Sequence, residues 1–290
     1  MFAVLPRIPL AWVVAKANTS EHTLLKRLIR KLSPGDLLLI DNGFYAFKLF
    51  VLLLQARCSF IIPLAKNTKP RVIRRLSPHD YLVEISDSDR HRDATLVLRL
   101  VYVYRRGFRR RRLLTNLLDP DKYSAGDLAR LYHLRWDIET FHRDFKETMQ
   151  ARTWHCQTPD TFQKELTMHM IAVTLIRRTM LEAARQRRLP PAQLSFARAL
   201  TEARVFLRLI VGTADQIART LCRQFVQACR RHRVSLKPGR SFPRDPQQYR
   251  AKARGLQKKR RGRPCTPVPC LHETLPETLT YANGECYALC

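Results

Sequence analysis

One segment of this sequence, YHLRWDIETFHRDFK at residues 132–146, combines an acidic side chain with basic and aromatic ones. On a single helix, at about 100° of rotation per residue, Tyr132, Arg135, Glu139 and Lys146 would lie within about 60° of one another. A carboxylate among cations suits a site at which Glu139 binds a divalent metal while Arg135 and Lys146 hold phosphate groups. The chemistry of such a site is the cutting and joining of a phosphodiester backbone.

The same spacing has an ordinary explanation. Exposed helix faces often carry Glu and Arg three or four residues apart, where the charges pair and have no further role. The spacing alone favours this explanation, so a second motif is needed before a catalytic site is preferred.

A second candidate acid, Asp41, follows the wholly apolar run Leu37–Ile40. Such a run is typical of a central strand that is covered on both faces. In open α/β sheets the carboxyl ends of the strands face the ligand crevice, which places Asp41 well for a metal. The alternative is a turn, because Asp-Asn-Gly is a common loop sequence.

Both motifs resemble parts of one protein family. Tyr-x2-Arg-x3-Glu-x6-Lys is similar to the signature of bacterial insertion-sequence transposases that have a DDE triad and a Tyr-Arg-Glu-Lys motif. LSPGDLLLIDNGFYAFKLF at 32–50 resembles the segment around the second catalytic Asp of that family. RRLLTNLLDPDKYSAGDLARLYHLRWDIETFHRDFK at 111–146 resembles the strand, loop and helix that lead to its catalytic Glu. The similarity covers residues 8–210, and two motifs in the right order distinguish it from a chance match.

The resemblance implies a ribonuclease-H-like fold with two Mg²⁺ ions between the acids. Carried over by position, it makes Asp41 and Glu139 metal ligands, and Tyr132, Arg135 and Lys146 contacts to DNA near the cut end. The implied reaction is attack of water on a terminal phosphodiester, followed by attack of the freed 3′-hydroxyl on target DNA. The implied partner is double-stranded DNA, both element terminal repeats and target, bound by a homodimer.

The sequence departs from the family pattern at the first Asp. Only Glu21 and Asp36 are acidic before Asp41, and we expect them at a helix start and in a turn. We therefore expect a chain truncated at its amino terminus and inactive, because two ligands hold Mg²⁺ less well than three. The alternative function is a noncatalytic DNA-binding remnant that interferes with intact transposase. A third possibility, a structural RNA-binding protein, lacks any RNA-recognition motif.

The charge of the chain also indicates a polyanionic partner. Lys and Arg number 53 against 24 Asp and Glu, a formal net charge of +29. Arg109 and Arg110 belong to a cluster of six arginines within residues 105–112, which either grips a DNA backbone or is a solvated hairpin turn. No run of eighteen apolar residues occurs, and Pro6 and Pro9 interrupt the apolar amino-terminal stretch. We expect a cytoplasmic, nucleoid-associated protein without a membrane partner.

Periodicity predicts the elements that position these residues. We expect strands at Leu10–Ala15, Leu37–Ile40 and Ser59–Leu64, and helices from Ser20 to Leu32, at Tyr45–Gln55, at Phe162–Met180 and at Pro191–Val211. Ser124 with Asp127 gives a capping-box-like start to the signature helix. Its predicted buried side consists of Leu128, Leu131, Leu134, Ile138, Phe141 and Phe145. Trp136 is expected in the core, although an unpaired base could also stack on it.

The predicted fold class is α/β, a ribonuclease-H-like core, incomplete at its N-terminus, with a β-rich insertion and a C-terminal helical region. We divide it into the amino-terminal part of the core (1–66), the β-strand insertion (67–116), the rest of the core with the signature helix (117–225) and a basic disordered tail (226–290). Four cysteines suit reduced core thiols, namely Cys58, Cys156, Cys222 and Cys229. The spacing of Cys265, Cys270, His272, Cys286 and Cys290 does not match the usual zinc sites.

Overall fold

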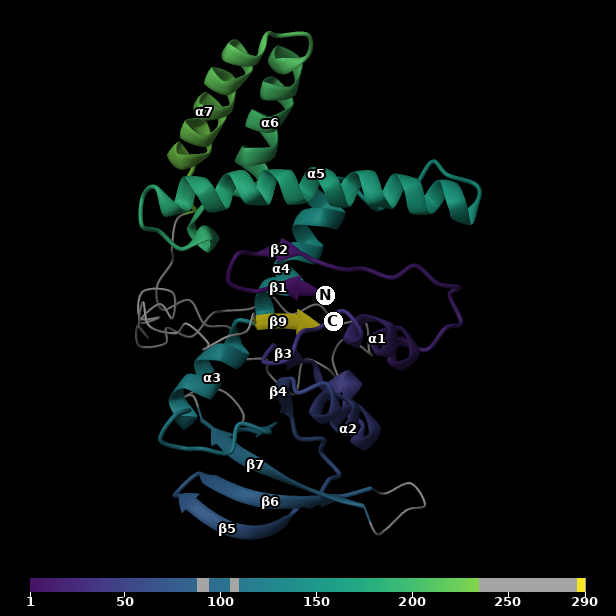
Figure 1. Ribbon diagram of the computed structural model, residues 1–290, viewed down its shortest axis with the longest axis vertical. Coiled ribbons are helices and arrows are strands. Elements are labelled where there is room, and N and C mark those ends of the chain that lie inside the picture. The colour runs from purple at the N-terminus through teal and green to yellow at the C-terminus, as the bar shows by residue number, and fades with distance from the viewer. Residues whose placement is uncertain (88–93, 105–109, 235–285, 290) are drawn as a thin grey trace, which may run out of the picture.

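The computed structural model of this chain describes residues 1–87, 94–104, 110–234 and 286–289. Within them, nine strands form one sheet in the order β2–β1–β9–β3–β4–β8–β7–β6–β5 (Figure 1). The strands are β1 (Phe2–Ala3), β2 (Ile8–Pro9), β3 (Leu37–Ile40), β4 (Ser59–Pro63), β5 (Arg71–Ser77), β6 (Asp80–Ser86), β7 (Thr95–Val103), β8 (Arg111–Thr115) and β9 (Cys286–Leu289).

The middle of the sheet is parallel. Strand β3 pairs in parallel with β4 on one side and with β9 on the other, whereas the remaining strand pairs are antiparallel. All four residues of Leu37–Ile40 are 0% exposed, so the predicted buried strand before Asp41 is confirmed.

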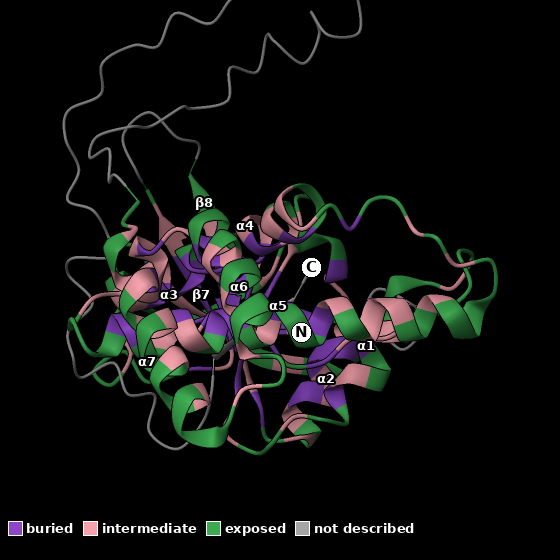
Figure 2. Ribbon diagram, turned by 90° about the horizontal axis from the view of Figure 1, so that it is seen from above, coloured by how far each residue is buried: buried purple, intermediate pink, exposed green. Residues whose placement is uncertain are grey.

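Helices cover both faces of this sheet. They are α1 (Glu21–Ile29), α2 (Phe47–Gln55), α3 (Ala125–His133), α4 (Trp136–Arg143), α5 (Pro159–Arg185), α6 (Phe196–Ile210) and α7 (Asp215–Arg231). Leu38 and Ile40 belong to a cluster with apolar residues of α1 and α2, while Leu37 and Leu39 belong to a second cluster with residues of α3, α4 and α5. This division follows from the alternation of side chains along a strand. Buried residues gather in the interior, and exposed ones follow α5, α6 and α7 (Figure 2). Three short helices complete the fold: η1 (Asn42–Phe44), η2 (Asp144–Thr148) and η3 (Pro191–Gln193).

The predicted β-rich insertion extends this sheet. Strands β5 to β8 form an antiparallel meander, and β8 pairs with β4. A fully buried ion pair fixes the meander to the loop that leads into α3. The Arg99 guanidinium of β7 binds Asp80 of β6 at 2.8 Å and donates to the carbonyls of Leu117, Asp119 and Tyr123. The insertion therefore supports the start of the signature segment.

The amino-terminal strand lies elsewhere than predicted. Residues Leu10–Ala15 have no regular structure, and the strands are Phe2–Ala3 and Ile8–Pro9. The prediction failed at Pro9, which lacks the N–H needed to continue a strand and is tolerated at the end of the edge strand β2.

The carboxyl-terminal region is helical, as predicted. Thr158 caps α5 in a capping box, and Ser195 caps α6, which starts later than predicted because Pro190 and Pro191 precede it in an extended segment and the short η3. Helices α6 and α7 stand as a hairpin on α5, away from the sheet (Figure 1). None of the helices in the described residues is both long and apolar enough to cross a membrane.

Two expectations about this region were wrong. Cys222 is exposed on α7, unlike the buried Cys58 and Cys229. Strand β9 lies within the segment expected to be a disordered tail, because it pairs with strands from the other end of the chain. The Lys- and Arg-rich part of that tail, with Cys265, Cys270 and His272, lies outside the described residues. The observed architecture is otherwise the predicted α/β class, a mixed sheet with helices that is consistent with a ribonuclease-H-like core.

Candidate active site at the end of strand β3

Asp41 lies where the buried strand β3 ends. Its carboxylate caps η1 by accepting a hydrogen bond from the Asn42 backbone N–H at 2.8 Å. The side chain remains 48% exposed. Since β3, β4 and β9 run parallel, their carboxyl ends meet at the edge where Asp41 stands.

The signature segment is not the single regular helix that was predicted. Helix α3 ends at His133, and the N–H groups of Leu134 and Arg135 bond three residues back, which tightens the turn before α4. Lys146 then lies in η2, a π-helical turn with the opposite, wider winding. The four signature residues are thus carried by α3, the tight turn, α4 and η2 in succession.

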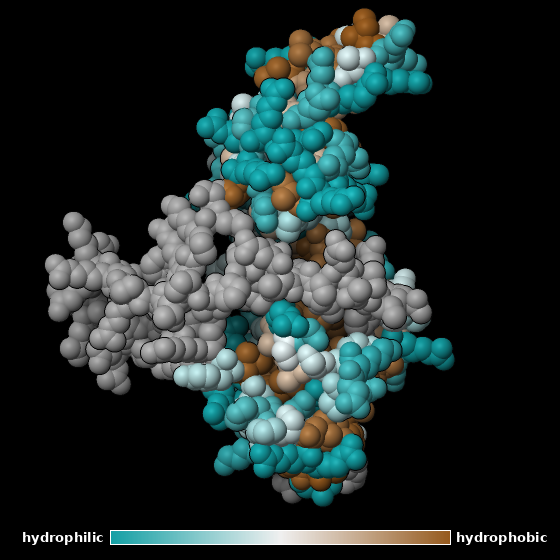
Figure 3. Space-filling model, turned by 90° about the vertical axis from the view of Figure 1, so that its left-hand side faces the viewer, coloured by the Kyte–Doolittle hydropathy of each residue, from teal (hydrophilic) through white to brown (hydrophobic). Residues whose placement is uncertain are grey.

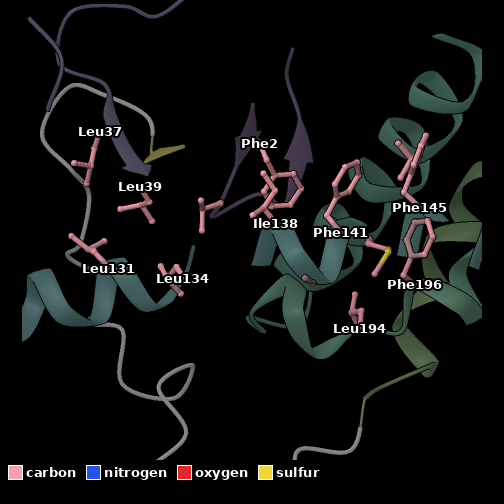
Figure 4. Packing of buried hydrophobic residues seen from close by; sticks show 14 of the residues in the cluster. Phe2, Leu37, Leu39, Leu131, Leu134, Ile138, Phe141, Phe145, Leu194 and Phe196 are labelled. Carbon is pink, nitrogen blue, oxygen red and sulfur yellow. The ribbon is translucent and has the colours of Figure 1, made fainter. Parts of the chain in front are cut away.

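The buried side of the segment is nevertheless as predicted. Leu128, Leu131, Leu134, Ile138, Phe141 and Phe145 are each 8% exposed or less. Several of them pack together with Phe2, Leu37 and Leu39 of the sheet (Figure 4). This packing holds α3 and α4 beside β3. The predicted start at Ser124 is also confirmed, because its hydroxyl accepts a hydrogen bond from the Asp127 N–H.

Arg135 joins the two candidate acids. Its Nη2 lies 2.8 Å from Oε1 of Glu139, and its Nη1 lies 3.9 Å from Oδ1 of Asp41. The Arg135 side chain is 11% exposed, whereas the side chain of Glu139 is 36% exposed. A largely buried guanidinium is a rigid, permanently charged fork, so it orients both carboxylates on one centre.

Tyr132 supports this centre from inside the core. It is 5% exposed, and its hydroxyl donates a hydrogen bond to the carbonyl oxygen of Ile40 at 3.2 Å. Burial raises the pKa of Tyr132 to about 12, so its phenol stays protonated at neutral pH. The Tyr132 hydroxyl is thus bonded to the strand that ends at Asp41, and the predicted contact between Tyr132 and DNA stays a prediction.

Comparison with known proteins shows the family of this chain. A family model described as "Transposase DDE domain" matches residues 3–175, which include Asp41 and the whole signature segment. The chain belongs to this family. The transposase InsG for insertion sequence element IS4 of Escherichia coli (strain K12) is 28% identical over 238 residues, which are 78% of this chain and 54% of InsG. The chain thus spans about half the length of this curated relative.

DDE transposases generally use a divalent metal, and the two acids of this transposase domain partly fit one. Among the described residues, no three His, Cys, Asp or Glu side chains are grouped closely enough to hold a metal ion. Asp41 and Glu139, however, share a cation already, namely the Arg135 guanidinium. Mg²⁺ is commonly bound by one or two carboxylates together with water and substrate phosphates. Asp41 and Glu139 would hold such a metal only together with water and substrate phosphates.

The basic residues predicted to contact DNA differ in exposure. Lys146 is exposed on η2. Arg110 is also exposed, with its guanidinium 5.8 Å from the centre of the Tyr102 ring. Arg109 lies outside the described residues. Lys146 and Arg110 are therefore open to solvent, and their predicted roles stay predictions.

Two features of the site were not anticipated from the sequence. Trp136, expected in the core, is 53% exposed directly after Arg135, because two residues of helix place it about 200° around the axis from the buried Leu134 and Ile138. His142 is half-buried one helical turn after Glu139. Burial lowers the pKa of His142, and the charge of Lys146 lowers it further. The sequence could have indicated His142, because residues three apart, such as Glu139 and His142, lie on the same side of a helix.

Proposed function

We propose that this transposase domain binds the ends of an insertion element and that Asp41 and Glu139 are two of its metal ligands for cleavage and strand transfer of DNA. The observation that supports the proposal most strongly is the single guanidinium of Arg135, which brings together acids from two segments that are far apart in the sequence.

Each side chain has a distinct task in this proposal. Asp41 and Glu139 present carboxylate oxygens to Mg²⁺, of which the intact family site holds two. Arg135 orients both acids, and the exposed Lys146 binds a DNA phosphate close to them. When bound, the metal supplies an activated water and stabilises the leaving oxygen. His142 is neutral near pH 7, so it adds no positive charge beside Glu139.

A second candidate function is DNA binding without cleavage. The observation in its favour is that the described residues group no third His, Cys, Asp or Glu around Asp41 and Glu139. The chain carries a net charge of +29, which supports DNA binding whether or not cleavage occurs. In this second function the chain binds DNA without cutting it and competes with a catalytically active transposase for element ends.

One experiment separates the two functions. The purified chain, the Glu139→Gln variant and the control Glu147→Gln are incubated with labelled duplex DNA, with Mg²⁺, with Mn²⁺ and with EDTA. Glu147 is an exposed acid on η2 that pairs with Arg152, so the control removes the same charge close by. Binding and nicking are measured in the same samples.

Metal-dependent nicking that is lost only in Glu139→Gln, with binding unchanged, supports the catalytic function. Tight binding without nicking by all three proteins supports the noncatalytic function. Absence of DNA binding overturns both candidates.

Binding to DNA as a homodimer belongs to the same proposal. Several large apolar residues are exposed on the α6–α7 hairpin, namely Val205, Leu209, Val211 and Ile217. Figure 3 shows apolar surface at the far end of this hairpin, beyond a mostly hydrophilic stretch. Apolar patches of this kind are typical of protein–protein contacts. Light scattering of the chain with and without duplex DNA measures the stoichiometry.

A further inference from the structure

The signature segment carries two further acids, Asp137 and Asp144, that the proposed reaction does not use. Asp137 lies in the first turn of α4, and Asp144 is the first residue of η2. The side chain of each is 14% exposed. Asp137 precedes Glu139 by two positions, and Asp144 precedes Lys146 by two. Two residues span about half a turn of helix, so each aspartate lies on the side opposite its signature residue.

Both aspartates are paired with buried arginines from other parts of the chain. Nη2 of Arg177, on α5, lies 2.6 Å from Oδ2 of Asp144. Nη2 of Arg7, in the turn between β1 and β2, lies 3.7 Å from Oδ1 of Asp137. The side chains of Arg177 and Arg7 are only 3% and 8% exposed. Arginines this deeply buried are rare unless they are paired, so the inner side of the signature segment is held by charge as well as by apolar packing.

The guanidinium of Arg177 is held from two sides. It binds Asp144 and lies 4.6 Å from the centre of the ring of Phe196, the first residue of α6. Burial, and then the positive charge of Arg7, lower the pKa of Arg177 to about 10, so the group stays charged at neutral pH. Arg177 therefore joins η2, α5 and α6 at one point.

The turn that Arg177 contacts has an unusual winding. Its closing hydrogen bond runs from the Met149 N–H to the Asp144 carbonyl at 3.0 Å, five residues back instead of four. Such π-helical turns are rare, because ordinary α-helical winding competes with them. The backbone of Asp144 thus closes the turn while its side chain binds Arg177. Since Lys146 lies inside this turn, the winding sets the direction in which its side chain leaves the helix.

We propose that Arg177 is a positioning residue for Lys146: by holding Asp144 it keeps η2 in its wide winding and Lys146 in one direction. The inference rests on the proposed contact between Lys146 and a DNA phosphate. A buried ion pair often stabilises a fold no more than apolar residues of similar volume would, but its geometry is more restricted. The pair is therefore better suited to fixing a position than to adding stability.

The test removes both charges of the pair together. The double variant Arg177→Met with Asp144→Leu keeps the net charge and leaves neither partner buried alone, so we expect its melting temperature to stay within about 5 °C of the original. The control Arg71→Met with Glu84→Leu removes an ion pair whose arginine side chain is 73% exposed. Lys146→Ala is then introduced into the unaltered chain, the double variant and the control, and binding to labelled duplex DNA is measured.

The effect of Lys146→Ala should depend on the buried pair. In the unaltered chain and the control, we expect it to weaken binding about tenfold at low salt and to make the salt dependence shallower by about one. In the double variant we expect a loss of less than about twofold, because Lys146 is no longer fixed. Equal losses in all three backgrounds overturn the positioning role and leave the proposed function intact. No loss in any background overturns the proposed contact of Lys146 with DNA, and this inference with it.

A second measurement follows η2 itself and needs no DNA. Amide hydrogen exchange is measured at Met149, whose N–H closes the turn. We expect slow exchange in the unaltered chain and in the control, and exchange faster by about tenfold or more in the double variant. Exchange of Met149 at the unprotected rate in the unaltered chain would show that η2 is not fixed. That result overturns the proposal even where the double variant does not fold.

Discussion

The hydroxyl of Tyr132 donates a hydrogen bond to the backbone carbonyl of Ile40 across 92 positions of sequence. Ile40 is the last residue of β3, and Asp41 follows it directly. Three residues after Tyr132, Arg135 contacts Asp41 from the same side. The signature segment is therefore fixed to the acid-bearing strand both by a neutral buried hydrogen bond and by a charged contact.

Tyr132→Phe tests the neutral part of this connection. The ring remains and keeps its packing, but the Ile40 carbonyl loses its side-chain donor inside the core. We expect a loss of about 1–2 kcal/mol in the free energy of unfolding, measured by urea denaturation. The control Tyr104→Phe removes an exposed hydroxyl and should change nothing, because Tyr104 is 69% exposed. Equal stabilities of the two variants would contradict the role of Tyr132.

Asp80→Asn tests how far the insertion supports the site. It removes the charge that balances Arg99, whose side chain is 0% exposed. Removing one partner of a buried ion pair typically lowers the free energy of unfolding by about 3–5 kcal/mol, because the other charge stays buried without a partner. The matched control is Glu84→Gln on the same strand, which pairs with the mostly exposed Arg71 and should have no measurable effect. A small change in the free energy of unfolding of Asp80→Asn would show that the fold does not need the Arg99–Asp80 ion pair.

The pH dependence of stability should reveal His142. Burial first, and the charge of Lys146 second, lower its pKa in the folded chain below the ordinary value of 6.5. The unfolded chain therefore takes up the proton at a higher pH than the folded chain. The stability that His142 contributes is present above pH 6.5 and is lost as the pH falls through the lower, folded-state pKa.

Urea denaturation at several pH values between 7 and about 4 measures this loss. In the His142→Gln variant the free energy of unfolding should change less with pH over this range. Parallel curves for the two proteins would rule out the buried, neutral state of His142.

The strand before Asp41 and the buried side of the signature segment were predictable from the sequence. Leu37–Ile40 is an uninterrupted apolar run, and apolar spacing survives small changes in helical winding. The break at Arg135 was not predictable, because bonding to the third or the fourth preceding residue leaves the apolar pattern almost unchanged. Strand β9 was missed for another reason. A four-residue strand has no periodicity of its own, and its partner lies at the other end of the sequence.

The charged part of the connection is tested by Arg135→Ala. We expect weaker binding to duplex DNA, because Asp41 and Glu139 then repel phosphates without a neighbouring guanidinium. The effect should be about tenfold at low salt, and a plot of log affinity against log salt should be shallower by about one. The control Arg130→Ala removes an arginine of α3 that pairs with Asp127, away from both acids. Similar losses in both variants would show that net charge alone explains the binding.

Trp136 offers a last test, because exposed aromatic rings can stack on unpaired bases of DNA. Its indole is 53% exposed directly after Arg135, so truncation leaves the core intact. We expect Trp136→Ala to weaken binding of single-stranded DNA by about 1–3 kcal/mol and binding of fully paired duplex much less. The free energy of unfolding should not change, which separates stacking from a packing role. A loss of stability, or equal losses on single-stranded and duplex DNA, would mean that the ring stacks on no base.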